Sequence, residues 1–191
     1  MPASRERLGV LMHPWIVRAE GEVVPFPSER VEAWARFDTF FQEEHERLFK
    51  ALYFVTGNRH DAEELMQDAF VAVWERWDRV SGMDEPTGYL YRTAMNRFRS
   101  RLRRASRAAR RTVGSDPGGD AFAAADERDA VARALARLPE RQRFAIVLTE
   151  LLGYGSEEAG RILGVKDVTV RSLASQARAA LRTHLEEDHD A

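Results

Sequence analysis

Residues 156–181 constrain the fold more than any other stretch of the sequence. They read SEEAGRILGVKDVTVRSLASQARAAL, in which two runs of helical periodicity are separated by a very short break. Gly164 lies in this break, where glycine adopts a positive φ at little cost, and Gly160 is small where two helices would cross closely. Asp167 is placed to cap the second helix. The stretch predicts a helix-turn-helix, and an ordinary helical hairpin with a solvated face is the alternative.

The second helix of this motif would bury one side and expose the other. Its apolar Val170 and Leu173 are placed to close a small core with Ile162, Leu163 and Val165, which precede it. The opposite side carries residues that can bond to phosphates and to base edges in a DNA major groove. These candidate DNA-binding residues are Lys166, Thr169, Arg171, Ser172, Ser175, Gln176 and Arg178.

The remainder of the chain also has helical rather than strand periodicity. Apolar residues recur at helical spacing over residues 37–57, 60–77, 89–104 and 127–152, and no segment shows sustained strand alternation. Gly57 is suited to end the first of these helices, and Pro139 to open a later one. The sequence therefore predicts an all-α protein with two small helical domains joined by a flexible linker, the second domain ending in the helix-turn-helix.

The expected domain boundaries follow from composition. An irregular N-terminal extension precedes the first domain, and the linker contains Pro117 and three glycines, which favours mobility. Each domain is small enough to have only a thin core. The expected parts are the extension 1–36, the first domain 37–104, the linker 105–126, the second domain 127–185 and an acidic tail 186–191.

Charge is distributed very unevenly along the chain. From Arg92 to Arg111 there are nine arginines and no carboxylate, whereas residues 38–85 hold twelve acidic and five basic side chains. The formal net charge of −2 conceals this polarity. Such charge blocks usually serve binding partners rather than folding.

The basic segment GYLYRTAMNRFRSRLRR (88–104) combines arginines with aromatic residues. It can be the solvated face of a packed helix, it can lie on an anionic membrane, or it can follow a nucleic-acid backbone with an aromatic ring near unstacked bases. Its apolar side consists of residues typical of a core, which argues against the membrane. Arg92, Asn96, Arg99 and Arg103 lie close to one line on the helix, and the separate helix-turn-helix strengthens the nucleic-acid interpretation.

The acidic segment HDAEELMQDAFVAVWERW (60–77) places carboxylates beside Phe70 and Trp74. An acidic face with aromatic anchors fits a basic protein partner, while burial in the core is the alternative for both rings. His60 and Glu64 are spaced i, i+4, but no third soft metal ligand accompanies them. Because the sequence also lacks a nucleophile elbow and a phosphate-binding glycine loop, we expect no catalytic residue, no metal and no cofactor.

Composition also bears on the cellular compartment. The chain has no cysteine, which excludes disulfides and thiolate zinc sites. No apolar run approaches the ~18 residues needed to cross a bilayer. The apolar stretch near the start is short and broken by His13 and Pro14, unlike a signal peptide. We therefore expect a cytoplasmic protein without membrane insertion.

Three segments resemble those of a known family, the extracytoplasmic-function sigma factors of bacterial RNA polymerase. The acidic segment 60–77 is similar to the family's second-region helix, EPTGYLYRTAMNRFRSRLRR (85–104) to the segment that follows it, and residues 134–181 to the fourth region. They occur in the family's order. The resemblance implies a non-catalytic factor that binds core RNA polymerase and directs promoter recognition, DNA melting and transcription initiation.

The resemblance also implies roles for particular residues. The clamp helices of the largest polymerase subunit would be bound by Asp61, Glu63, Glu64, Gln67, Asp68, Phe70 and Trp74. The minus-ten element would be bound by Tyr89, Arg92, Asn96, Arg99, Arg103 and Arg104. The helix-turn-helix candidates named above would contact the minus-35 element, and residues 138–152 would meet the polymerase flap. An anti-sigma factor, not identifiable from the sequence, is a further expected partner.

The sequence departs from the family pattern at several positions. Tyr89 stands where the family usually has tryptophan. Ala159 and Gly160 replace a common Ile-Ala pair, which predicts looser packing of the first helix of the helix-turn-helix. Leu173 and Gln176 stand where arginines are frequent, so fewer phosphates would be neutralised and the affinity for DNA would be lower.

Two other classes of function remain open at this point. A stand-alone helix-turn-helix regulator would bind duplex DNA without polymerase and would normally dimerise, although no dimerisation heptad is visible in the sequence. A metal-dependent nuclease would be built on His60, Glu64 and Asp68.

Overall fold

The computed structural model describes residues 15–17, 23–25, 28–111 and 130–189. Contacts within the chain divide it into two compact units, residues 1–40 and 41–191. The expected linker lies mostly outside the described residues, as does the end of the acidic tail.

The first unit contains a short β-hairpin that the sequence did not predict. Strand β1 (Trp15–Val17) pairs antiparallel with strand β2 (Val23–Pro25), and Ile16 lies opposite Val24. Four of these six residues are β-branched, which favours an extended backbone, but each run is too short to show strand alternation. The expectation of no strands is therefore wrong here. Helix α2 (Ser28–Thr56) also begins in this unit, before the expected start at residue 37.

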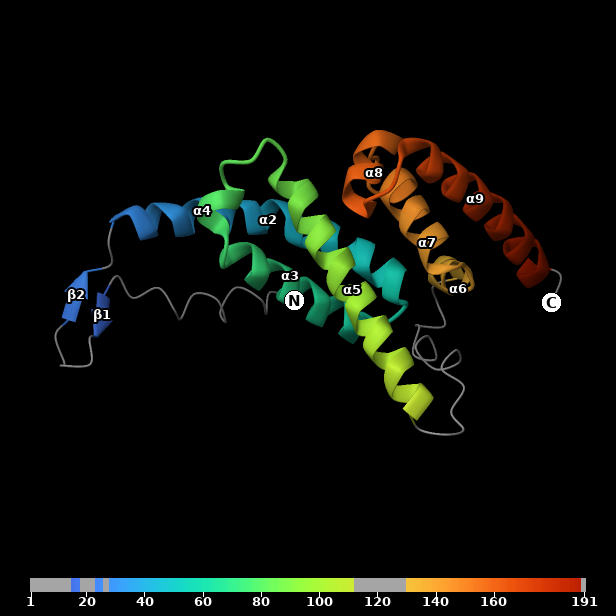
Figure 1. Ribbon diagram of the computed structural model, residues 1–191, viewed down its shortest axis with the longest axis horizontal. Helices are drawn as coiled ribbons and strands as arrows, with labels where there is room; N and C mark the ends of the chain where they lie inside the picture. The colour runs from blue at the N-terminus through green and yellow to red at the C-terminus, as the bar shows by residue number, and fades with distance from the viewer. Residues whose placement is uncertain (1–14, 18–22, 26–27, 112–129, 190–191) are drawn as a thin grey trace. The chain divides into compact units, whose positions relative to one another are not determined.

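The second unit consists of helices, and the all-helical fold class is confirmed (Figure 1). Helix α5 continues past Arg104, so its last turns cover the start of the stretch expected to be a linker. After α2, the described helices are α3 (Arg59–Trp74), α4 (Trp77–Val80), α5 (Pro86–Arg111), α6 (Ala130–Ala136), α7 (Glu140–Ile146), the π-helical segment η2 (Val147–Leu151), α8 (Ser156–Leu163) and α9 (Asp167–His189).

The connection between α2 and α3 sets where the acidic helix begins. Gly57 ends α2 with a φ of 68°, the left-handed conformation that glycine tolerates best. Asn58 then caps α3, and its side-chain oxygen accepts a hydrogen bond from the Asp61 main-chain nitrogen at 3.1 Å. Glycine and asparagine at these two positions therefore fix the first turn of α3, from which Asp61 projects.

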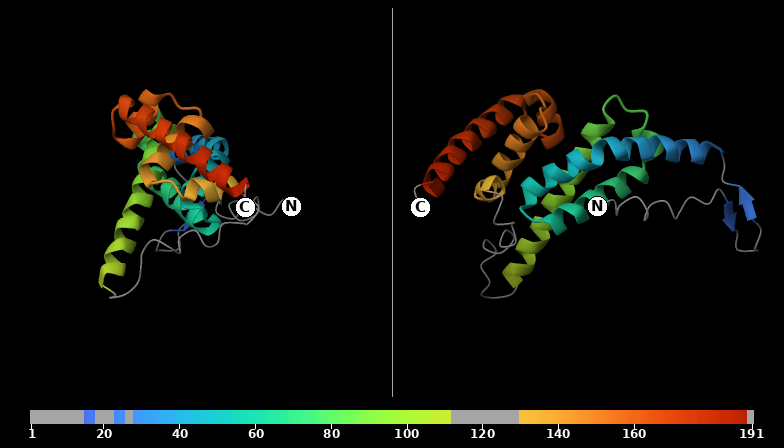
Figure 2. Two further views of the ribbon diagram at one scale, coloured as in Figure 1. Left: turned by 90° about the vertical axis from the view of Figure 1, so that its right-hand side faces the viewer. Right: turned by 180° about the vertical axis from the view of Figure 1, so that it is seen from behind.

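Helix α5 packs against helices that come before it and after it in the sequence. It packs against α3 and also against α8, while α7 and α8 pack on α9 (Figure 2). The rings of Phe98 on α5 and Phe144 on α7 meet edge to face with centroids 5.5 Å apart, and both are buried. Aromatic pairs in this geometry add stabilisation beyond the area that they bury.

Two glycines shape the turn between α8 and α9. Gly164 ends α8 with a φ of 70°. A Cβ atom at Gly160 would lie 2.7 Å from the Val165 carbonyl oxygen, so only glycine permits this approach. The Val165 main-chain nitrogen donates to the Gly160 oxygen at 3.0 Å across the same contact. The looser packing expected from Gly160 is thus not found, because the missing side chain lets the turn close tightly on α8.

Candidate polymerase-binding and nucleic-acid interfaces

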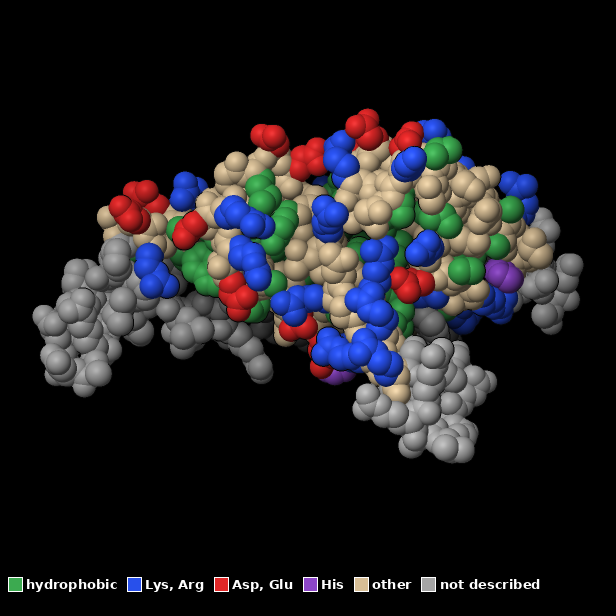
Figure 3. All heavy atoms as spheres, viewed as in Figure 1, with side chains coloured by type: hydrophobic (Ala, Val, Ile, Leu, Met, Phe, Trp, Pro, Cys, Tyr) green, Lys and Arg blue, Asp and Glu red, His purple; other side chains and the backbone are tan. Residues whose placement is uncertain are grey.

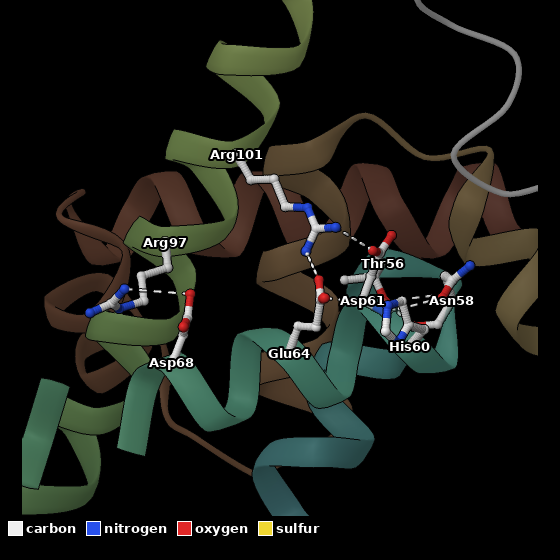
Figure 4. Close-up of polar contacts among 8 residues, drawn as sticks. All are labelled: Thr56, Asn58, His60, Asp61, Glu64, Asp68, Arg97 and Arg101. Atoms are coloured by element: carbon white, nitrogen blue, oxygen red, sulfur yellow. Dashed lines mark hydrogen bonds and ion pairs between the residues drawn. The ribbon is translucent and has the colours of Figure 1, made fainter. Parts of the chain in front are cut away.

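The acidic side of α3 faces arginines that project from α5 (Figure 4). Arg101 forms ion pairs with Asp61 at 2.7 Å and with Glu64 at 2.8 Å, one through each terminal nitrogen. Arg97 lies 3.5 Å from the Asp68 carboxylate. The sequence separated these charges into an acidic block and a basic block, but folding brings part of each block together.

The remaining charges on this side of α3 are also paired. Glu63 pairs with Arg59 at 2.9 Å, and Glu64 lies 3.3 Å from His60. The hydrogen bond from Arg101 to Glu64, together with the charge of His60, holds the pKa of Glu64 below its usual range. The side chains in these pairs are largely exposed, so the pairs can exchange partners at little cost.

An uncharged strip on α3 completes the surface. Gln67 is exposed, Val71 is 57% exposed and Trp74 is half-buried, and their spacing of four and three residues places them on one line of the helix. Phe70 belongs to the core instead, where its ring meets Phe41 edge to face at 4.7 Å. Sequence reasoning missed Val71, although its position four residues after Gln67 could have indicated it.

The candidate minus-ten residues lie mainly on the side of α5 that faces away from α3. Arg92, Asn96 and Arg103 are exposed there. Figure 3 shows Lys and Arg side chains gathered along α5. Arg104 is exposed as well, and Tyr89 is half-buried with the Arg79 guanidinium over its ring at 5.7 Å. Helix α5 therefore presents one face to α3 and a different basic face, partly exposed, on the side of α8.

Among the candidate minus-ten residues, Arg99 is bonded to other helices rather than exposed. Its Nε donates to Glu140 Oε1 at 3.3 Å, and one terminal nitrogen donates to the Leu163 carbonyl at 3.4 Å. The guanidinium also lies over the Phe144 ring at 5.2 Å. The predicted minus-ten helix thus contacts α7 and the end of α8 through Arg99, which no spacing in the sequence indicated.

A hollow of about 710 Å³ lies beside Arg99, between α5 and the helix-turn-helix. Its lining has four arginines against the single carboxylate of Glu140, which is paired with Arg99. Leu102 and Leu163 form part of its apolar lining. The arginines are Arg99, Arg103, Arg107 and Arg141. A cavity with this lining favours an anionic segment that also carries apolar side chains.

The second helix of the helix-turn-helix, α9, exposes the predicted DNA-binding residues. Val170, Ala174 and Ala177 form its buried side. Lys166 and the candidates Arg171, Ser172, Ser175, Gln176 and Arg178 are exposed, and Thr169 is half-buried. Two of these arginines are ion-paired within the protein, Arg171 to Asp167 at 2.6 Å and Arg178 to Glu150 at 2.7 Å. The bond from Arg171 holds the pKa of Asp167 below its usual range.

The described residues contain no candidate metal site: no group of three or more of their His, Cys, Asp or Glu side chains could hold a metal ion. No helix in the described part of the chain is long and apolar enough to span a membrane.

Two regions of the chain match known protein families. Residues 40–108 match the family described as Sigma-70 region 2, and residues 128–181 match the family described as Sigma-70, region 4. The sigma factor SigM of Mycobacterium tuberculosis H37Rv is 32% identical over 148 residues, which span 76% of this chain and 74% of SigM. SigE of Mycolicibacterium smegmatis is 32% identical over 177 residues, spanning 87% of this chain and 65% of SigE.

Solved structures agree with this assignment at the level of the fold. RpoE of Bartonella quintana, solved in complex with the anti-sigma factor NepR, superposes with a TM-score of 0.69 at 24% identity, over 79% of this chain and 97% of RpoE. CnrH in complex with the cytosolic domain of CnrY gives a TM-score of 0.60 at 27% identity, over 83% and 95% of the two chains. From its sequence motifs, its two matched regions and its curated relatives, the chain belongs to the extracytoplasmic-function (ECF) sigma factors of bacterial RNA polymerase.

Proposed function

We propose that this ECF sigma factor uses three separate surfaces to direct transcription initiation. The uncharged strip and carboxylates of α3 bind the polymerase clamp, the solvent face of α5 binds the minus-ten element, and α9 reads the minus-35 element. The main support for separate surfaces on α3 and α5 is that α5 has two different basic sides. Arg97 and Arg101 turn toward α3, whereas Arg92, Asn96 and Arg103 are exposed on another side of the helix.

The clamp surface combines an apolar centre with exchangeable charges. Val71 and Trp74 supply apolar area beside Gln67, and such residues act as anchors at the centre of protein interfaces. The carboxylates of Asp61, Glu64 and Asp68 lie along one side of this strip in partly exposed ion pairs. A basic clamp surface would compete for these carboxylates, which steers association more than it adds affinity.

The minus-ten surface suits a separated DNA strand. Exposed arginines on α5 neutralise phosphates, and an unstacked base can be held by an aromatic face and an amide. Asn96 supplies the amide, and Tyr89 the ring. Capture of a base offsets part of the cost of unpairing it, so binding and opening of the duplex are coupled.

Contact of α5 with α7 and α8 implies that the protein opens when it binds a promoter. The minus-ten and minus-35 elements are named by their positions and so lie roughly 25 base pairs apart. At 3.4 Å per base pair, this separation is about 85 Å along B-form DNA. Arg99 instead joins the minus-ten helix directly to Glu140 and to the Leu163 carbonyl. On the promoter, Arg99 would exchange these partners for a phosphate.

The proposal extends to partners and to compartment. RpoE was solved with the anti-sigma factor NepR and CnrH with the cytosolic domain of CnrY. The arginine-lined hollow beside Arg99 fits an acidic segment of an anti-sigma factor. Because its partners are polymerase and promoter DNA, we place the protein in the cytoplasm.

We assign it no catalytic reaction of its own. No observation favours the stand-alone regulator over the sigma factor.

The experiment that tests the proposal is co-elution of the purified chain with bacterial core RNA polymerase on size exclusion. We expect a stable complex for the wild type and for Gln42→Ala, which alters an exposed glutamine on α2. We expect a weakened complex for Gln67→Ala and a lost one for Val71→Asp, which puts a charge at the centre of the strip. A folded protein that does not co-elute with polymerase but binds duplex DNA alone would refute the proposal.

A further inference from the structure

The side of α9 that faces directly away from its core is not its charged side. Val170, Ala174 and Ala177 are buried and define the inner side. At about 100° per residue, the positions opposite them are Val168, Ser172 and Ser175. Val168 is 55% exposed and lies in the first turn of α9. In a helix-turn-helix, residues at the beginning of the second helix contact the base edges.

The position of Val168 is fixed by the turn before it. The close contact of Gly160 with Val165 holds the start of α9 against α8. The Lys166 carbonyl then accepts hydrogen bonds from the main-chain nitrogens of Thr169 at 2.9 Å and Val170 at 3.2 Å. A β-branched side chain on such a helix has one strongly preferred rotamer, so the two methyl groups of Val168 point in a defined direction.

Three longer polar side chains that follow Val168 on α9 have partners within the protein. Arg171 pairs with Asp167 at 2.6 Å, Arg178 pairs with Glu150 at 2.7 Å, and the Gln176 side chain accepts a hydrogen bond from Gln142 at 3.2 Å. At about 100° per residue, Arg171 and Arg178 lie about a quarter of a turn to one side of the line through Val168 and Ser172. The outermost line of α9 therefore offers methyl and hydroxyl groups to the groove.

We propose that Val168 is a specificity-determining residue that recognises the 5-methyl group of a thymine in the minus-35 element. This inference rests on the proposed function of α9. Thymine alone carries a methyl group in the major groove, and apolar side chains distinguish it from the other bases by contact with that group. Single exposed valines are common on protein surfaces. The place of Val168 at the start of the recognition helix, opposite the buried side, carries the proposal rather than its exposure.

The test uses holoenzyme formed with bacterial core RNA polymerase. A duplex library randomised over the minus-35 region is first selected for binding. Each thymine of the selected element is then replaced singly by deoxyuridine, which removes only the methyl group. We expect one or two replacements to weaken wild-type binding about fourfold, the value for one buried methyl group. The same replacements should have no effect on Val168→Ala holoenzyme, which should bind the thymine-containing element as weakly as the wild type binds the uracil-containing one.

Controls separate this inference from the function on which it rests. Val131→Ala alters another exposed valine, on α6, and should retain the full deoxyuridine penalty. If a minus-35 element is selected but no deoxyuridine penalty depends on Val168, or if the element has no thymine, the inference is refuted while the proposed function stands. If the library yields no minus-35 preference, the assigned role of α9 fails, and the inference fails with it.

Discussion

The Arg143 guanidinium on α7 donates a hydrogen bond to the main-chain oxygen of Val55 on α2 at 2.6 Å. Its other terminal nitrogen donates to the carbonyls of Ala136 and Leu138, each at 2.9 Å. Arg143 is only 6% exposed, and burial lowers its pKa to about 10, so it remains charged at neutral pH. One buried cation thus closes the turn between α6 and α7 and joins that turn to the last turns of α2.

Replacing this cation should destabilise the fold. Arg143→Met removes charge-assisted hydrogen bonds to three buried or partly buried carbonyls, and we expect the free energy of unfolding to fall by about 3 kcal/mol. Arg141→Met, at an exposed arginine on the same helix, should change it by less than about 0.5 kcal/mol. Urea unfolding followed by circular dichroism measures both values. Equal stability of the two variants would show that the Arg143 contacts contribute little.

Gly160 should tolerate no side chain. The Cβ atom of Gly160→Ala would meet the Val165 carbonyl oxygen at 2.7 Å, and backbone must move to relieve this contact. We expect a loss of about 2 kcal/mol in the free energy of unfolding, together with weaker binding to minus-35 DNA. Gly82→Ala is the matched control, because its Cβ would lie 3.9 Å from the Arg79 carbonyl oxygen, an ordinary contact, and its stability should hardly change. A Gly160→Ala protein as stable as Gly82→Ala would contradict the tight turn.

The pKa of Glu64 should depend on Arg101. Removal of the hydrogen bond in Arg101→Met should raise the pKa of the Glu64 carboxyl toward its ordinary value, which a ¹³C NMR titration measures directly. Because the folded-state pKa is lowered, the stabilisation from the pair is complete above the unfolded-state pKa and is lost as the pH falls through the folded-state pKa. The stability difference between wild type and variant should shrink over that acidic range. Arg104→Met should leave the pKa of Glu64 unchanged, and an equal shift in both variants would exclude the specific pair.

Local signals in the sequence predicted the helices, but not the contacts between them. Apolar spacing located the helices, and Gly57 and Pro139 located the end of α2 and the start of α7, because these effects act within a few residues. The hairpin was missed, since two three-residue strands are shorter than any reliable alternation. The engagement of Arg99 by Glu140 was missed because it joins helices 41 residues apart in the sequence, and no local pattern encodes such a pair. Phe70 could be assigned to the core only once the packing of α2 on α3 was known.

The contact between Arg99 and Glu140 should restrain DNA binding by the free protein. Glu140→Gln removes the charge that holds Arg99 and weakens the junction between α5 and α7. We expect the free protein to bind a single-stranded minus-ten oligonucleotide about two- to fivefold more tightly, the range for a partly exposed ion pair. Glu157→Gln makes the same change in net charge, but its partner Arg161 lies within α8. Fluorescence anisotropy measures both affinities, and equal gains would indicate a general effect of charge.

Asn96 and Gln67 should affect different steps of initiation. Both are exposed polar residues whose replacement by alanine removes an amide without opening the core. Asn96→Ala should impair promoter opening, measured by permanganate reactivity of unpaired thymines, by about tenfold while co-elution with core polymerase is retained, because one base loses a bidentate partner worth about 1–3 kcal/mol. Gln67→Ala should weaken polymerase binding and leave opening normal once saturating protein restores the holoenzyme. Loss of both steps in both folded variants would mean that α3 and α5 do not act as separate surfaces.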